Sequence, residues 1–254
     1  MTFATYPSLA GRVVFISGGA TGIGADLVRA FARNQARVAF VDVQAEAGAA
    51  LAKDLAEAGE TALFLECDVT RIPSLQAAIK QIRSVLGPVG VLINNAANDD
   101  RHRVDDVTPD YWDQTQNVNL RHHFFAAQAV HPQMREIGSG SIVNLSSVAW
   151  RAGAADMPAY AAAKAGVVGL TRALARAFGP DNIRVNAIEP GAVMTERQKR
   201  LWYRTPEEVA AMARRQSIQS TLLGEDVARV ALFLGADDSR MITKQSIAVD
   251  AGIR

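Results

Sequence analysis

Residues 13–24 read Val13-Val-Phe-Ile-Ser-Gly18-Gly-Ala-Thr-Gly22-Ile-Gly24. The apolar run predicts a buried β-strand, and the periodic pattern that follows Gly24 predicts an α-helix. The glycines between them permit a tight turn from strand to helix. Such a strand–turn–helix unit is typical of α/β proteins with a parallel sheet.

The alternation of short apolar runs with longer helical patterns continues to the C-terminus. Strands are predicted at Val13–Ile16, Val38–Val41, Ala62–Leu65, Val91–Ile93, Ser141–Leu145, Arg184–Ile188 and Ser246–Val249. Helices are predicted at Gly24–Asn34, Glu46–Glu57, Ile72–Leu86, Trp112–Glu136, Pro158–Phe178 and Glu225–Leu234. We therefore expect a single doubly wound α/β domain over residues 1–254, with a parallel seven-stranded sheet and helices on both faces.

One segment, Thr195–Gln216, interrupts this alternation and is polar, charged and aromatic. It follows the sixth strand, so we predict a substrate lid over residues 195–216. An ordinary surface excursion is the alternative.

Composition narrows the classes of function. The net charge is +1 and no long run of Lys or Arg occurs, which argues against a nucleic-acid partner held by phosphate contacts. Cys67 is the only cysteine, so no intramolecular disulfide can form, as fits a reducing compartment. No signal peptide and no apolar stretch of about 18 residues is evident. We expect a soluble, cytoplasmic protein without a membrane partner.

The glycine turn and Asp42 predict a nucleotide site. Backbone N–H groups at a helix N-terminus bind a pyrophosphate, and glycines let the ligand come close. Asp42 closes the second strand, where a carboxylate can bind ribose hydroxyls and repel the 2′-phosphate of NADP. No Arg or Lys lies in the turn or directly after Asp42. The pattern favours NAD; an aspartate that caps the next helix is the alternative.

Tyr160 and Lys164 share a helix face, and Ser147 precedes them. A neighbouring ammonium favours the phenolate, so it can lower a tyrosine pKa from its usual value of about 10. A shift of about 3 units corresponds to roughly 4 kcal/mol, part of which a cationic cofactor ring could supply. For the pair alone, packing beside a solvated charge is the alternative.

Two further turns follow predicted strands. Asn94-Asn95-Ala96-Ala97 follows the fourth strand, and Pro190-Gly191 follows the sixth, with Thr195 close behind. Ligands bind at the carboxyl ends of parallel strands, so these turns are expected beside the cofactor.

Together these motifs resemble the short-chain dehydrogenase/reductase family from about residue 10 to the C-terminus. The resemblance implies a Rossmann fold, a homotetramer, and NAD-dependent oxidation or reduction at a CH–OH group. It rests on Gly18, Gly22, Gly24, Asp42, Asp68, Asn94-Asn95-Ala96, Asn119, Ser147, Tyr160, Lys164 and Pro190-Gly191.

The resemblance also implies roles for four catalytic residues. Tyr160 is the general acid/base, and Lys164 binds the nicotinamide ribose and lowers the tyrosine pKa. Ser147 hydrogen-bonds the reacting oxygen, and Asn119 holds a water of a proton relay. The implied cofactor contacts are Gly18, Thr21, Gly22, Ile23, Gly24, Asp42, Asp68, Val69, Asn95, Ala96, Tyr160, Lys164, Pro190, Gly191, Val193 and Thr195.

The chain departs from the family pattern at three turn positions. Ala97, Lys244 and Ala251 stand where the family usually has glycine. These departures put the local turn geometry in question and leave the chemistry unchanged. His122 and His123 have no zinc-site spacing with His102 or His131, so we expect packed or interfacial histidines and no catalytic metal.

The variable segments are polar. Asn98-Asp99-Asp100-Arg101-His102 follows the fourth strand, and its alternative interpretation is a solvated loop with its own salt bridges. A sugar site needs several fixed donors and acceptors and often an aromatic face. The chain is similar to the aldose 1-dehydrogenases of the family at this loop and at Tyr111-Trp112-Asp113, Val118-Asn-Leu-Arg-His122, and Thr195-Glu-Arg-Gln198 with Trp202-Tyr203. The predicted substrate contacts are Asn98, Ser147, Trp150, Met157, Tyr160, Gln198 and Trp202.

We therefore predict hydride transfer to NAD from the anomeric carbon of an aldose such as D-xylose, L-arabinose, D-galactose or L-fucose, giving an aldonolactone. Reduction of a 3-oxoacyl thioester or another ketone, or oxidation of a polyol, is the alternative within the family. A non-catalytic NAD-binding regulator is the alternative outside enzymes, and the intact Ser147, Tyr160 and Lys164 argue against it.

Overall fold

The computed structural model describes residues 4–253 of the chain. A seven-stranded sheet has the order β3-β2-β1-β4-β5-β6-β7, and every neighbouring pair is parallel. This confirms the predicted doubly wound α/β fold. The strands are β1 Val13–Ser17, β2 Arg37–Asp42, β3 Ala62–Glu66, β4 Val89–Asn94, β5 Gly140–Leu145, β6 Ile183–Pro190 and β7 Ser246–Val249.

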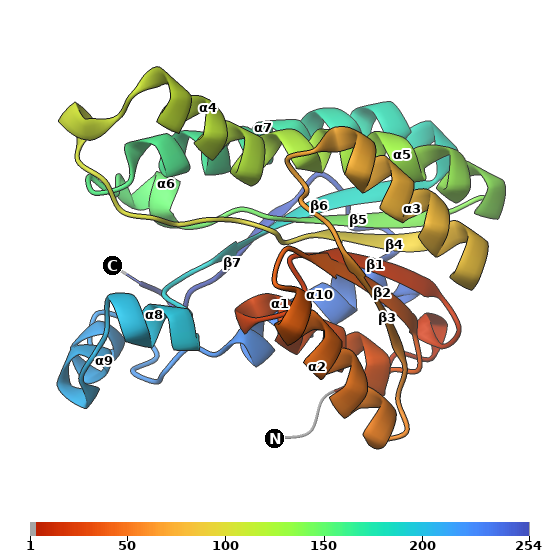
Figure 1. Ribbon diagram of the computed structural model, residues 1–254, viewed down its shortest axis with the longest axis horizontal. Coiled ribbons are helices and arrows are strands. Elements are labelled where there is room, and N and C mark those ends of the chain that lie inside the picture. Colours follow the sequence, from red (N-terminus) through yellow and green to blue (C-terminus); the bar gives the residue numbers. More distant parts are fainter. Residues whose placement is uncertain (1–3, 254) are drawn as a thin grey trace.

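Helices cover both faces of the sheet (Figure 1), with α3, α4, α5 and α7 on one side and α1, α2 and α10 on the other. Across residues 4–253, no helix combines the length and apolar character needed to cross a membrane. The helices are α1 Gly22–Arg33, α2 Ala45–Glu57, α3 Ile72–Leu86, α4 Pro109–Gln116, α5 His122–Ile137, α6 Ala149–Ala152, α7 Pro158–Phe178, α8 Glu196–Leu201, α9 Pro206–Ala213 and α10 Gly224–Gly235.

The central strands are unbroken apolar runs because both of their faces are covered. All five residues of β1 are buried. Successive strand side chains point to opposite faces, so Phe15 packs in the core beneath α3 and α5, whereas Ile16 packs in the core beneath α1 and α10. The two cores fix the sheet and thereby the positions of the turns at its carboxyl edge.

The helix expected over residues 112–136 is interrupted by a π-turn at Asn117–Arg121, between α4 and α5. The Asn119 side chain donates to the Thr115 carbonyl at 3.0 Å and also binds the backbone of Asn98. Single π-turns of this kind are frequent at functional sites. The irregular turn therefore ties the helix to the loop that follows β4.

The predicted lid segment contains α8 and α9, and its end is attached to the C-terminus. Thr205 and Glu208 form a capping box that begins α9. Gln216 bridges to Ile253, and the Ser217 amide donates to the Gly252 carbonyl at 3.0 Å. The segment is thus an ordered part of the fold; its movement as a lid stays a prediction.

Two of the three positions where glycine was expected have left-handed backbone. Lys244 has a φ of 66° and Ala251 a φ of 55°, whereas Ala97 has no positive φ. Only glycine adopts this region without a steric cost. The chain therefore keeps the turn geometry at Lys244 and Ala251 at a small cost in stability.

Candidate active site

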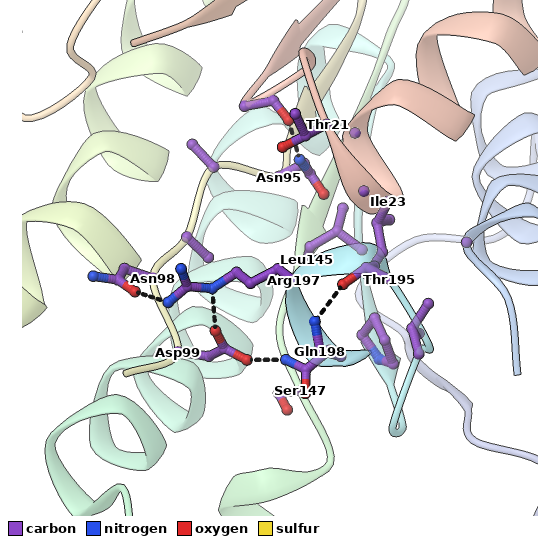
Figure 2. Close-up of a pocket in the computed structure, with 18 of the residues that line it drawn as sticks. Thr21, Ile23, Asn95, Asn98, Asp99, Leu145, Ser147, Thr195, Arg197 and Gln198 are labelled. Carbon is purple, nitrogen blue, oxygen red and sulfur yellow. Dashed lines mark hydrogen bonds and ion pairs between the residues drawn. The ribbon is translucent and has the colours of Figure 1, made fainter. Parts of the chain in front are cut away.

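A cavity of about 1640 Å³ lies at the carboxyl ends of the strands, where β1 and β4 lead to opposite sides of the sheet. Ligands of doubly wound proteins bind at this switch point. Figure 2 shows the cavity between the glycine turn, the loop after β4 and helix α8. Every residue predicted to contact the cofactor lines it.

The glycine turn closes on itself so tightly that a side chain cannot fit. A Cβ atom at Gly24 would lie 1.8 Å from the Gly18 carbonyl oxygen, and Gly22 has a φ of 55°. Thr21, which precedes α1, makes no side-chain cap; its hydroxyl accepts instead from Gln44 Nε2 at 3.1 Å. The first amides of α1 have no acceptor within the helix. These donors at the cavity wall fit the pyrophosphate of a dinucleotide.

Side-chain hydrogen bonds hold the turn against the end of β4. Ser17 Oγ accepts from the amides of Asn95 at 3.0 Å and Ala96 at 3.2 Å. Asn95 Nδ2 donates to the Gly18 carbonyl at 2.7 Å. The predicted cofactor residue Asn95 therefore also fixes the shape of the turn.

Asp42 lies at the end of β2 and lines the cavity beside the turn. It is 8% exposed. One carboxylate oxygen accepts from the Ala20 amide at 3.0 Å and the other from the Gln44 amide at 3.1 Å. It therefore orders the turn between β2 and α2 and still has lone pairs for a ribose hydroxyl. Because Gln44, the N-cap residue of α2, makes no side-chain cap, the capping alternative is not confirmed. Asp68 also lines the cavity and accepts from the Thr70 amide and hydroxyl.

The structure brings Ser147, Tyr160 and Lys164 together. Lys164 is fully buried, and its Nζ lies 5.6 Å from the centre of the Tyr160 ring, one helical turn along α7. This amine donates to the Leu145 carbonyl at 2.8 Å, at the end of β5. Ser147 follows β5 and hydrogen-bonds Tyr160. All three residues line the cavity.

The pKa of Tyr160 in this structure differs from the expectation that Lys164 lowers it. Burial raises the pKa of the Tyr160 phenol, and the Asp99 carboxylate raises it further, while the Ser147 hydrogen bond lowers it. Burial also lowers the pKa of Lys164 to about 7, against the effect of Asp99. Burial disfavours the charged form of both groups, and an amine whose pKa is lowered stabilises a phenolate less than a fully charged one would. The lowered pKa of Tyr160 stays a prediction for the complex with cofactor.

Asn119 is buried and is absent from the described cavity wall. Its Oδ1 accepts from the Asn98 amide at 2.9 Å, and its Nδ2 donates to the carbonyls of Asn98 at 3.1 Å and Thr115 at 3.0 Å. The side chain therefore supports the loop after β4. Its role in a water relay stays a prediction.

The wall opposite the glycine turn is made of side chains from two distant segments (Figure 2). Asn98 and Asp99 belong to the loop after β4, and Arg197 and Gln198 belong to α8. Arg197 donates to Asp99 at 3.2 Å and to Asn98 at 3.0 Å, and Gln198 Nε2 also donates to Asp99. Among the predicted substrate contacts, Asn98, Ser147, Met157, Tyr160 and Gln198 line the cavity.

Trp150 and Trp202, which were expected to contact the substrate, are not among the described lining residues. The Arg151 guanidinium lies 5.3 Å from the Trp150 ring, and the Arg101 guanidinium lies 4.2 Å from the Trp202 ring. Both indoles thus pack against cations, which is a favourable arrangement. Tyr203 is the aromatic residue of the lid segment that lines the cavity.

The loop Asn98–His102 was expected either to line the site or to form its own salt bridges. It does both. Arg101 pairs with Asp156 at 3.2 Å, and Asp100 pairs with Arg197. Asp99 and Arg197 are charged cavity residues to which the sequence pattern assigned no role. Their charge was visible in the sequence, but their partners lie nearly a hundred residues away.

His122 and His123 are fully buried in this subunit, which confirms the packed interpretation. His122 Nε2 lies 3.0 Å from the Ala96 carbonyl, which can only accept, so this nitrogen carries the hydrogen. Burial lowers the pKa of His122 to about 3 and keeps the ring neutral. Over residues 4–253, no cluster of three His, Cys, Asp or Glu side chains is arranged to hold a metal.

Comparison with known proteins gives matches along nearly the whole chain. A family model described as enoyl-(acyl carrier protein) reductase matches residues 18–254. The chain is 47% identical to the "Probable galactose dehydrogenase" of Rhizobium meliloti over 98% of its own length and 97% of that protein. It is 44% identical to D-xylose 1-dehydrogenase of Caulobacter vibrioides over 100% of both chains. A solved 3-oxoacyl-(acyl-carrier protein) reductase from Brucella melitensis has a TM-score of 0.91 at 32% identity, covering 100% of this chain and 97% of that one.

Proposed function

Because this chain belongs to the short-chain dehydrogenase/reductase family, whose dehydrogenases use a nicotinamide cofactor, we propose that it oxidises the anomeric carbon of an aldose with NAD. The observation that carries the proposal is the Ser147–Tyr160–Lys164 group in the same cavity as a wall of hydrogen-bonding side chains. The similarity to a galactose and a xylose dehydrogenase supports it. D-Galactose, D-xylose, L-arabinose and L-fucose are the substrates to test first.

In the proposed mechanism the ring form of the aldose lies with its anomeric hydroxyl between Ser147 and Tyr160. Ser147 donates a hydrogen bond to the reacting oxygen, and the Tyr160 phenolate removes the hydroxyl proton. When bound, NAD supplies the nicotinamide carbon that accepts the hydride. Lys164 binds the nicotinamide ribose in this mechanism and passes the proton onward. The product is an aldonolactone, which hydrolyses to the acid.

The proposal specifies NAD rather than NADP because of Asp42. Its buried carboxylate lines the cavity, which supports a role in binding an adenosine ribose and in repelling a 2′-phosphate. Its two hydrogen bonds to backbone amides hold that carboxylate in place. A comparison of kcat/KM with NAD and with NADP tests this choice, and a preference for NADP would contradict it.

Within the family, reduction of a 3-oxoacyl thioester or another ketone is the competing function, and the similarity to the Brucella reductase favours it. The polar wall around Asn98, Asp99 and Gln198 counts against an acyl chain, because an apolar chain would cover the remaining lone pairs of these groups without offering them a hydrogen bond. A non-catalytic regulator is disfavoured because Ser147, Tyr160 and Lys164 are all present in the cavity.

The proposal includes a cytoplasmic homotetramer, as the family resemblance implies. Exposed Trp112 and Phe124 lie on α4 and α5, where a neighbouring subunit could cover them. Light scattering of the purified protein measures the mass directly. A monomer in dilute solution would contradict this part alone.

The experiment that tests the function is NADH formation on a panel of aldoses: D-xylose, L-arabinose, D-galactose, L-fucose, L-rhamnose and D-glucose. Simple alcohols and 3-hydroxyacyl thioesters serve as controls, and each substrate is repeated with NADP. We expect strong activity with NAD on one or two sugars. Activity confined to alcohols or thioesters would overturn the sugar proposal and leave the assignment of Tyr160 intact.

A further inference from the structure

We propose that Asp99 selects the substrate: its carboxylate accepts hydrogen bonds from ring hydroxyls of the aldose other than the anomeric one. This inference rests on the proposed function and adds a residue to it. Asp99 lies in the loop after β4 and lines the cavity, and its side chain is 26% exposed.

The structure fixes the direction of this carboxylate. Arg197 Nε donates to Oδ1 at 3.2 Å, and Gln198 Nε2 donates to Oδ2. Both donors come from α8, so each oxygen has one protein partner on the same side. A carboxylate offers about four lone-pair sites, which leaves acceptor capacity on each oxygen for a substrate hydroxyl.

The carboxylate is also close to the reacting groups. Its charge raises the pKa of Tyr160 and that of Lys164. Figure 2 shows Asp99 and Gln198 at the same end of the cavity as Ser147. An aldose whose anomeric hydroxyl lies between Ser147 and Tyr160 would therefore present its other hydroxyls toward Asp99.

A charged acceptor explains selection as well as binding. Hydrogen bonds to an ionised group are about twice as strong as neutral ones. A substrate that lacks the matching hydroxyl would cover the open lone pairs of Asp99 without supplying a donor, and sites built to hydrogen-bond a substrate hydroxyl discriminate against such analogues. The ion pair with Arg197 compensates the charge of Asp99 while a substrate covers it.

The chain provides a matched control in the next residue. Asp100 also pairs with Arg197 and accepts from Asn98 Nδ2 at 2.8 Å. It is 52% exposed and is not among the described lining residues. Asp100→Asn therefore makes the same chemical change in the same loop without touching the substrate.

The test combines Asp99→Asn with deoxy analogues of the best aldose, each lacking one ring hydroxyl. With the wild type, one analogue should lose about 10- to 100-fold in kcat/KM relative to the parent sugar. With Asp99→Asn, the parent sugar should lose a similar factor, and the penalty for removing that hydroxyl should largely disappear. Asp100→Asn should keep the wild-type penalty, and the affinity for NAD should be unchanged in both variants.

Each outcome decides a specific point. A wild type that turns over no aldose would overturn the proposed function and this inference together. A wild type that turns over aldoses while Asp99→Asn keeps the full penalty for every deoxy analogue would overturn the role of Asp99 alone. If Asp99→Asn does not fold, Asp99→Ser is measured with the same aldose and the same deoxy analogues. Serine keeps a small polar side chain that cannot carry the charge, so this variant tests the same role of Asp99.

Discussion

The part of the cavity beside the glycine turn is shaped mainly by backbone, whereas the part beside α8 is shaped by side chains. In the first part, the turn packs so closely that Gly24 cannot carry a Cβ atom, and Ser17 and Asn95 hold main-chain groups in place. In the second part, Asp99 is held by Arg197 and Gln198. We call these the cofactor half and the substrate half.

The difference explains why one half could be predicted and the other only partly. The glycine turn of the cofactor half is local in sequence, so a spacing of glycines at the end of a strand predicts that turn, although Asn95, which holds it, lies 77 positions from Gly18. The substrate half depends on pairs such as Asp99 and Gln198, which are separated by 99 positions. A single sequence does not reveal such pairs. Its charged residues therefore predicted a polar site without predicting which side chains face the cavity.

The largest expected effect comes from the residue where the two halves meet. Tyr160→Phe should lower kcat by about 10³-fold, because the general base is lost. The affinity for NADH, measured by its fluorescence, should stay largely intact, because the other cofactor contacts and the backbone of the cofactor half are untouched. A variant that retains most of its activity would contradict the role of Tyr160.

Gly24→Ala should break the cofactor half selectively. The added methyl group would meet the Gly18 carbonyl at 1.8 Å, and overpacking of this kind costs about 1–3 kcal/mol in the free energy of unfolding. NAD affinity should fall as well because the turn must open. Thermal unfolding and NADH titration measure both effects.

The control for this variant is Gly169→Ala on α7, where nothing lies within 4 Å of the added atom. Alanine is the better helix former, so this change should raise the free energy of unfolding by about 0.5–1 kcal/mol. Equal changes in the free energy of unfolding and in NAD affinity at Gly24 and Gly169 would contradict the role of the tight turn in cofactor binding.

The pH dependence of turnover tests how the substrate half acts on the base. Asp99 is one of the two causes that raise the pKa of Tyr160, after burial. The active phenolate is the deprotonated form, so removing the negative charge should move the acidic limb of the kcat profile to lower pH. Asp99→Asn should show this shift by up to about one unit, and Asp100→Asn should show less. A shift to higher pH would contradict the electrostatic account.

The smallest expected effect concerns a turn outside both halves. Lys244 has a φ of 66°, which costs about 1 kcal/mol for a residue with a side chain. Lys244→Gly removes this strain but makes the unfolded chain more flexible. A net gain of about 0.5 kcal/mol in the free energy of unfolding is expected, with unchanged kinetics. A loss of stability would show that the lysine side chain contributes more than the strain costs.

Individual elements show which features of the structure the sequence pattern predicted and which it did not. Strand β7 has the bounds that the pattern predicted, and the unbroken apolar runs correctly predicted strands covered on both faces. The π-turn around Asn119 was not predicted, because helical periodicity does not show where a side chain enters the backbone ladder. The indoles of Trp150 and Trp202 pack against neighbouring arginines, and side-chain direction of this kind depends on tertiary contacts.

The most direct test of anomeric hydride transfer follows the hydrogen on the anomeric carbon of the aldose. The aldose that reacts best would be labelled with deuterium at its anomeric carbon and oxidised with NAD by the wild type. We predict that the deuterium appears in NADH at the nicotinamide ring and that the product is the aldonolactone. Deuterium that remains in the sugar product, with oxidation at another carbon, would contradict anomeric hydride transfer and the orientation of the sugar between Ser147 and Tyr160.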